Sequence, residues 1–217
     1  MKGLLIKDLR LMKNMGNSLA LILVMAVGMS FYIKDISFIV VYMAIIGTTL
    51  TSSTISYDEF DNGNAFLFSL PVSRKDYVLE KYLFSLLMCG VGWLLGSIIA
   101  IVAGAARHAL VPAEGLMTAV ALLPVAIGLN VVLIPLRLKF EAEKSRIAQI
   151  MVMGGFFLVC VLGAKLAERL GIDLNALGER MPAMSEGAGI AAVLAVSVAL
   201  LCISCHISIR IMERKEF

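Results

Sequence analysis

Charged side chains are scarce in this sequence. Asp, Glu, Lys and Arg make up 16% of its 217 residues, whereas 60% of the residues are hydrophobic, and the mean hydropathy is +0.93. Soluble globular domains carry about 25% charged residues. The composition therefore excludes an ordinary soluble domain, and the length leaves no room for a separate soluble catalytic domain beside a membrane domain.

Several enzyme motifs are also missing. The sequence has no phosphate-binding G-x-x-x-x-G-K-[ST] loop, no G-x-S-x-G nucleophile motif and no H-E-x-x-H metal motif. Its four cysteines, Cys89, Cys160, Cys202 and Cys205, all lie in apolar runs, where they are expected to act as small hydrophobic residues rather than as redox or metal ligands. We therefore expect no catalytic residue, no metal site and no cofactor bound by this chain.

Six long apolar runs dominate what is present. A helix rises about 1.5 Å per residue, so a bilayer core about 30 Å thick requires roughly 17–25 apolar residues. Backbone amides in lipid must bond internally, which makes each run a helix. The sequence predicts an all-α integral membrane protein, with residues 1–217 as one membrane domain and spans near 17–33, 36–56, 82–106, 117–136, 147–166 and 188–209.

The cations are sorted onto alternate connections between these runs. With the N-terminus in the cytoplasm, 14 of the 19 Lys and Arg residues fall on inner segments. By the positive-inside rule, both termini are then cytoplasmic, in a multi-pass protein of the cell membrane. Because the basic residues serve mainly as topology signals, nucleic-acid binding is not expected. The inner cations are Lys2, Lys7, Arg10, Lys13, Arg74, Lys75, Lys81, Arg137, Lys139, Lys144, Arg146, Arg210, Arg214 and Lys215.

Residues 1–16 predict a short interfacial helix ahead of the first span. Leu5, Leu9 and Met12 recur at helical spacing with Leu4 beside them, and cations supply the other side. Such a helix lies along the membrane surface while its lysines reach toward water. The alternative interpretation is a frayed basic tail.

The longest inner connection, residues 57–81, predicts a binding surface. Acidic residues begin it, the turn Asn62-Gly63-Asn64 follows, and an aromatic cluster ends at Pro71. Ser73 and Asp76 have the spacing of a helix cap and begin the helix of the third span. Exposed apolar clusters of this kind mark partner sites, and the alternative is that the phenylalanines only dip into the lipid interface. The candidate residues are Asp58, Glu59, Phe60, Asp61, Phe66, Leu67, Phe68 and Leu70.

Polar residues inside the spans are few. The six runs contain no central Asp, Glu, Lys or Arg, which argues against a proton or ion pathway. The candidate pathway-lining residues are Thr48, Thr51, Ser52 and Asn130. The alternative for the hydroxyl groups is a local hydrogen bond to a carbonyl one turn earlier.

The whole chain resembles the permease subunits of ATP-binding-cassette exporters of the type-2 superfamily. The resemblance is carried by the lead-in MKGLLIKDLRLMKN, by Tyr57–Phe60, by Leu70-Pro71-Val72-Ser73-Arg74, and by Lys81-Tyr82 at the start of the next helix. The spans match in character only. The narrower likeness is to small permeases that export phenol-soluble modulins and similar amphipathic peptides, and the small outer loops leave no large external domain of the kind some relatives have.

This resemblance implies a homodimer that works with two copies of a separate cytoplasmic ATPase, which binds ATP and Mg. The interfacial helix would be the elbow, and a coupling helix within Asp58–Leu70 would insert into the ATPase. Phe60, Phe66 and Phe68 would be its seated aromatics, with Asp58, Glu59 and Asp61 as a charged rim. The implied function is export of a hydrophobic or amphipathic substrate, such as a peptide toxin, antimicrobial peptide, lipid or drug. The alternative is a membrane-embedded regulatory or scaffold protein that binds a partner without transport.

Overall fold

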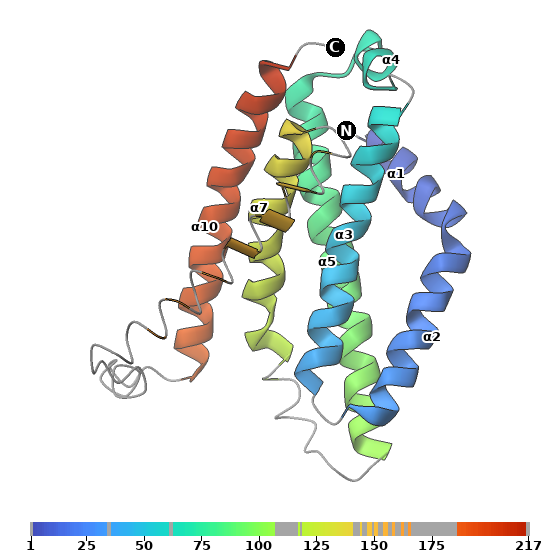
Figure 1. Cartoon of the computed structure of the whole chain (residues 1–217), viewed down its shortest axis with the longest axis vertical. Helices are drawn as coiled ribbons and strands as arrows, with labels where there is room; N and C mark the ends of the chain where they lie inside the picture. Colours follow the sequence, from blue (N-terminus) through green and yellow to red (C-terminus); the bar gives the residue numbers. More distant parts are fainter. Residues whose placement is uncertain are drawn as a thin grey trace.

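The computed structural model describes residues 2–33, 36–60, 63–106, 119–140 and 186–215, together with a few separate positions between 117 and 165. Every regular element in this part of the chain is a helix (Figure 1). Asp61 and most of the predicted fifth span, 147–166, lie outside the described residues. The helices are α1 (Lys2–Asn14), α2 (Gly16–Tyr32), α3 (Ile36–Glu59), α4 (Gly63–Ser69), α5 (Arg74–Ala106), α7 (Leu123–Lys139) and α10 (Glu186–Glu213).

Four stretches of described helix are long and apolar enough to cross a membrane: Ser37–Glu59, Arg74–Ala106, Ala119–Lys139 and Gly189–Glu213. Helices α1 and α2 meet at a bend of 67°, and the pair makes a fifth span if it is counted as one. The protein is therefore an all-helical membrane protein with four or five candidate spans in the described residues. The total of six stays a prediction, as does the interfacial position of α1.

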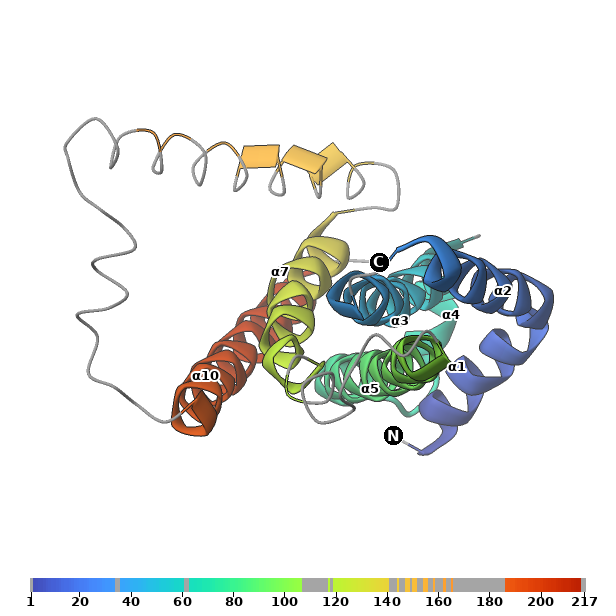
Figure 2. The same cartoon turned by 90° about the horizontal axis from the view of Figure 1, so that it is seen from below.

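Helices α3 and α5 form the centre of the molecule. Figure 2 shows them side by side, with α1 and α2 on one side and α7 and α10 on the other. Their backbones approach closely because glycines face the partner helix at Gly47, Gly92 and Gly96. A Cβ atom on Gly96 would lie 3.1 Å from the carbonyl oxygen of Ile39. Small residues at such a contact maximise van der Waals packing between helices in lipid.

Hydroxyl groups connect α7 and α10 to this centre. Tyr82 of α5 forms hydrogen bonds with Ser204 (2.7 Å) and Ser208 (2.8 Å) of α10. Ser204 also donates to the carbonyl oxygen of Val131 in α7, at 2.6 Å. One buried tyrosine and two serines therefore join α5, α7 and α10.

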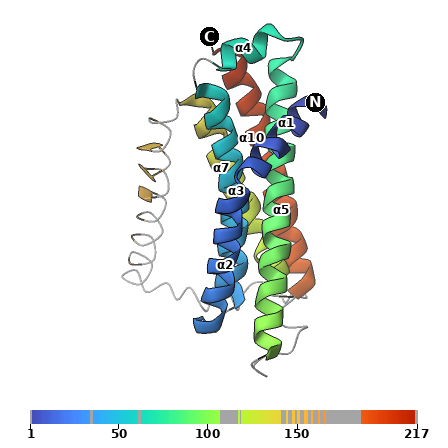
Figure 3. The ribbon, with the colours of Figure 1, turned by 90° about the vertical axis from the view of Figure 1, so that its right-hand side faces the viewer.

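The short helix α4 covers one end of the bundle. Figures 1 and 3 place α4 and the C-terminus at this end, and α1 crosses α3 and α5 in the same half of the molecule. The predicted cap of α5 is confirmed, since the backbone amide of Asp76 donates to Ser73 Oγ at 3.0 Å. An apolar core lies beneath α4 and includes Leu4, Leu67, Tyr77 and Met212. We call this region the α4 end.

Candidate functional site

Helix α4 and its flanks present three aromatic side chains in two different ways. Phe66 is 71% exposed and Phe60, just after α3, is 72% exposed. Phe68 is half-buried instead, and its ring packs edge-on against Tyr77 with 5.6 Å between centroids. Leu67 is buried in the core under α4, whereas Leu70 is 45% exposed. The outward apolar surface of this end therefore includes Phe60, Phe66 and Leu70.

Helix α4 sits directly on the last turn of α3. A Cβ atom on Gly63 would lie 2.7 Å from the carbonyl oxygen of Asp58, so a larger residue would force the two helices apart. Glu59 is paired with Lys215, whose Nζ lies 3.0 Å from Glu59 Oε1. The same ammonium donates to the carbonyl oxygen of Leu138 at 3.2 Å. The C-terminal segment thereby ties the ends of α3 and α7 together.

Beneath this surface, a buried cluster of charges joins three helices. Lys81 of α5 has no exposed surface, and its Nζ lies 2.5 Å from Asp8 Oδ2 of α1 and 2.9 Å from Asp58 Oδ2 of α3. Lys7 contacts Asp58 and lies 3.3 Å from Asp8 Oδ1. Tyr77 donates a hydrogen bond of 3.1 Å to Asp58 Oδ2. We call Lys7, Asp8, Asp58, Tyr77 and Lys81 the ionic cluster.

The ionic cluster balances two carboxylates against two ammonium groups. Such a buried group is well compensated only while every member is present, since removing one partner of a buried pair costs about 3–5 kcal/mol. Glu80 lies beside it, 1% exposed, with 3.8 Å between its Oε2 and Lys81 Nζ. Neither carboxylate oxygen of Glu80 has a hydrogen-bond partner in the described part of the chain. The cluster fixes α1 against the ends of α3 and α5 that flank α4.

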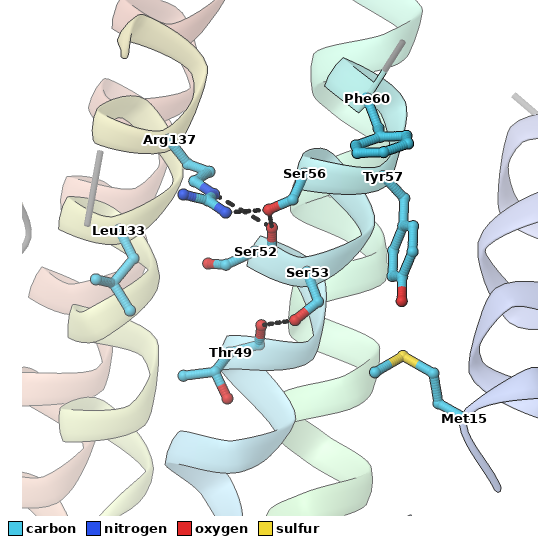
Figure 4. Close-up of a pocket in the computed structure, with 9 residues that line it drawn as sticks. All are labelled: Met15, Thr49, Ser52, Ser53, Ser56, Tyr57, Phe60, Leu133 and Arg137. Atoms are coloured by element: carbon cyan, nitrogen blue, oxygen red, sulfur yellow. Dashed lines mark hydrogen bonds between the residues drawn. The ribbon is translucent and has the colours of Figure 1, made fainter. Parts of the chain in front are cut away.

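A pocket of about 430 Å³ opens on the other face of α3 (Figure 4). The guanidinium of Arg137, from the last turn of α7, donates to the carbonyl oxygen of Ser52 at 3.3 Å and to the hydroxyl of Ser56. Arg137 is only 4% exposed. The pocket is lined by Met15, Thr49, Ser52, Ser53, Ser56, Tyr57, Phe60, Leu133 and Arg137.

The comparisons with known proteins decide the family. Residues 3–213 match a family model described as an ABC-2 family transporter protein. The chain belongs to this family. Permeases of the family lack ATPase activity themselves, so membership implies a separate partner ATPase. The chain has no match among curated proteins or solved structures.

In this ABC-2 family protein, the four candidate pathway residues lie in different surroundings. Ser52 lines the pocket, whereas Thr48, Thr51 and Asn130 are buried between helices. Thr48 donates to the carbonyl oxygen of Ala44 at 2.9 Å, which is the local bond considered as the alternative. Asn130 of α7 accepts a hydrogen bond from Ser85 and donates to the carbonyl oxygen of Ala126 at 3.0 Å. Whether these residues line a pathway stays a prediction.

Seven of the eight candidate partner-binding residues lie in the described part of the chain, and they too have different surroundings. Phe60, Phe66 and Leu70 face outward, Glu59 is bound to Lys215, and Asp58 lies in the ionic cluster. Leu67 and Phe68 pack inward against the core under α4. Their roles in partner binding stay predictions.

Sequence reasoning missed the buried charges of this ABC-2 family protein. It treated Arg137 only as a topology signal, and Lys81 as a topology signal and the start of a helix, but both are buried between helices. It also did not single out Asp8, which α1 buries together with Leu4 and Met12. A signal was available, because Asp8 is the only acidic residue among the first 34 and lies four residues from both Leu4 and Met12. That spacing puts all three on one helical face.

Proposed function

We propose that this chain is the membrane subunit of an exporter for a hydrophobic or amphipathic substrate, driven by ATP hydrolysis in a separate partner. The substrate class includes peptide toxins, antimicrobial peptides, lipids and drugs. In this proposal, two copies of the chain form a homodimer with six spans each, and two copies of a cytoplasmic ATPase bind ATP and Mg. The α4 end, which carries the C-terminus, faces the cytoplasm of the cell that holds the protein in its plasma membrane.

The observation that carries the proposal is the exposed aromatic surface of the α4 end. Phe60 and Phe66 are each more than two-thirds exposed, although they stand beside an apolar core into which neighbouring side chains pack. Aromatic anchors that fill a desolvated pocket on a partner commonly dominate the binding energy. In the proposal, α4 is the coupling helix, and the rings of Phe60 and Phe66 enter the ATPase.

The contacts below α4 supply a route for the ATPase to move the membrane helices. Gly63 holds α4 against the end of α3, and Asp58 in that last turn contacts Lys81 of α5 and Lys7 of α1. A displacement of α4 is therefore transmitted to three helices through backbone contact and buried ion pairs. We propose that this displacement switches the bundle between inward-facing and outward-facing states.

Co-purification of the ATPase with the tagged chain tests the coupling surface. The double variant Phe60→Ala/Phe66→Ala should reduce the ATPase recovered by about tenfold or more, because each aromatic anchor contributes strongly to such interfaces. Phe68 is left unchanged because it packs on Tyr77. Membrane insertion, followed by the amount of chain in the membrane fraction, should not change.

A matched control removes the same kind of surface from the opposite end of the bundle. Phe31 and Tyr32, at the end of α2 away from α4 (Figure 1), are 72% and 90% exposed. The variant Phe31→Ala/Tyr32→Ala should leave ATPase recovery unchanged. Full recovery with the Phe60/Phe66 variant would show that the partner binds elsewhere.

The regulatory or scaffold alternative makes a different prediction for turnover. A scaffold would retain the ATPase but would not couple its activity to cargo. Amphipathic peptides should stimulate ATP hydrolysis by the reconstituted complex if the chain is an exporter, and a neighbouring reading frame should encode an ATPase with a P-loop. Membership in a transporter family favours the exporter.

A further inference from the structure

Helix α1 crosses the bundle instead of running along it. It meets α2 at a bend of 67°, and Figure 2 places it at the edge of the molecule, beside α5 and α2. With α2 crossing the bilayer, as in the proposed function, this bend sets α1 nearer to the plane of the membrane than to its normal. The surroundings of α1 then depend on how the helix is rotated about its own axis.

The contacts of α1 fix this rotation. On one flank, Lys7 contacts Asp58 in the last turn of α3. On the other flank, Leu5 packs against the apolar cluster that contains Leu50. Leu50 precedes Asp58 by eight residues, or about 12 Å along α3 at 1.5 Å per residue. The Lys7 flank therefore faces the α4 end, and the Leu5 flank faces the interior of the span.

The side of α1 opposite its buried residues carries cations and two apolar side chains. It is formed by five exposed residues on neighbouring turns, which we call the lateral face of α1: Lys2, Ile6, Leu9, Arg10 and Lys13. The single acidic residue of α1 is Asp8, which is buried on the other side. Within the described part of the chain, the three cations of the lateral face form no ion pair.

The combination of charge and apolar surface favours a phospholipid as the partner. Ile6 is 51% exposed and Leu9 is 43% exposed. Leu9 lies one turn beyond Leu5 and so points toward the membrane interior, where acyl chains would cover it. Lys and Arg side chains lay their stems along apolar surface and extend their charged ends to the head groups. A nucleic acid or an acidic protein in water would meet the charges but leave both apolar side chains wet.

We propose that the lateral face of α1 binds anionic phospholipids, with its cations at the phosphate and its two apolar side chains against the acyl chains. This binding goes beyond the export function, and of that proposal it uses only the membrane crossing of α2. Asp8, on the opposite side of α1, is held by Lys81. The ionic cluster and the bound lipid therefore hold the helix from two sides.

Photolabelling of the full chain in phosphatidylcholine nanodiscs tests this lipid preference. The probes are phosphatidylglycerol and phosphatidylcholine with a diazirine at the same acyl carbon near the ester, each at the same low fraction. The phosphatidylglycerol probe should label α1 at least about fivefold more than the phosphatidylcholine probe, the effect of one cation near an anionic surface. Residues 21–32 of α2 are the internal reference, because α2 has no charged residue and both probes should label it equally. Equal labelling of α1 would overturn the proposal.

Substitution of the three cations examines their role. The variant Lys2→Gln/Arg10→Gln/Lys13→Gln should reduce the labelling ratio of α1 to that of α2, whereas Lys2→Arg/Arg10→Lys/Lys13→Arg keeps the charges and should keep the ratio. Lys7 is left unchanged because it belongs to the ionic cluster. A ratio that survives in the glutamine variant would refute the assignment of these cations.

A matched control removes three exposed cations from other parts of the chain. The variant Lys75→Gln/Arg210→Gln/Arg214→Gln lowers the net charge by the same amount and should leave the ratio of α1 unchanged. An equal fall in this control would show a general effect of charge and would contradict a site on α1.

Two further outcomes separate this proposal from its neighbours. If α2 is labelled and neither probe labels α1, protein covers the lateral face, as in a contact with a second copy of the chain, and the lipid assignment fails. If no ATPase co-purifies with the chain but the ratio of α1 persists, the export function fails while the lipid site stands.

Discussion

The contact between α3 and α5 near Gly92 and the ionic cluster at the α4 end hold the same two helices in different ways. At the first, the backbones of the two helices touch, because the glycines there have no side chains to hold them apart. At the second, Lys81 meets carboxylates from α1 and α3. Close van der Waals packing has one good geometry, whereas ion pairs can be exchanged for other ion pairs. The two helices are therefore held by shape at the first contact and by charge at the second, beside the proposed ATPase-binding surface.

The largest expected effect comes from removing the central cation. Lys81→Met leaves Asp8 and Asp58 close to each other with Lys7 as their remaining ammonium in the cluster. We expect a loss of about 3–5 kcal/mol in the free energy of unfolding, the cost of breaking a buried ion pair. The measurement is an unfolding titration in SDS, monitored by circular dichroism.

Two further variants test whether the loss measured with Lys81→Met comes from its ion pair with Asp8. Lys75→Met removes an exposed lysine of the same helix and should have little effect. The double variant Asp8→Asn/Lys81→Met leaves Lys7 to pair with Asp58, so its loss should be smaller than the sum of the single losses by roughly 0.5–3 kcal/mol. Additive losses would show that Asp8 and Lys81 do not interact.

A substitution at the glycine contact should have an intermediate effect. Gly92→Leu introduces a side chain where even a Cβ would collide with the carbonyl oxygen of Met43. We expect destabilisation of about 1–3 kcal/mol or more from overpacking, measured by the same titration. Gly90→Leu is the matched control, because a Cβ there has no atom within 4 Å apart from its own helical neighbours. Equal losses at the two positions would contradict the close approach of α3 and α5.

The smallest expected effect concerns the hydroxyl contact between α5 and α10. Tyr82→Phe removes the hydrogen bonds to Ser204 and Ser208 while retaining the ring. The expected loss is about 1 kcal/mol, the low end for two such bonds, because Ser204 keeps its bond to the carbonyl oxygen of Val131. Tyr57→Phe, at a position 53% exposed, is the control and should change the stability very little. A loss with Tyr82→Phe as large as that with Lys81→Met would remove the contrast between the charged and uncharged contacts.

Local sequence patterns were sufficient to predict several features of the fold. The apolar runs at 36–56 and 82–106 correspond to α3 and α5, although both helices extend further. The Ser73–Asp76 cap was predictable because both residues act within one helical turn. The sequence did not predict that Phe60 and Phe66 are exposed while Phe68 is packed, because no local pattern distinguishes the three rings. Only their position relative to Tyr77 distinguishes them.

The sequence by itself determined that this chain forms membrane-spanning helices and belongs to the ABC-2 family, because span length and composition are properties of continuous segments. The tertiary structure alone decided which charges meet. Asp8, Asp58 and Lys81 lie on three separate helices, and their ammonium-to-carboxylate distances of 2.5 and 2.9 Å depend on how those helices are rotated and shifted against one another. Arg137 reached the pocket beside α3 for the same reason, since helical periodicity fixes a residue's face but not the neighbour that covers it.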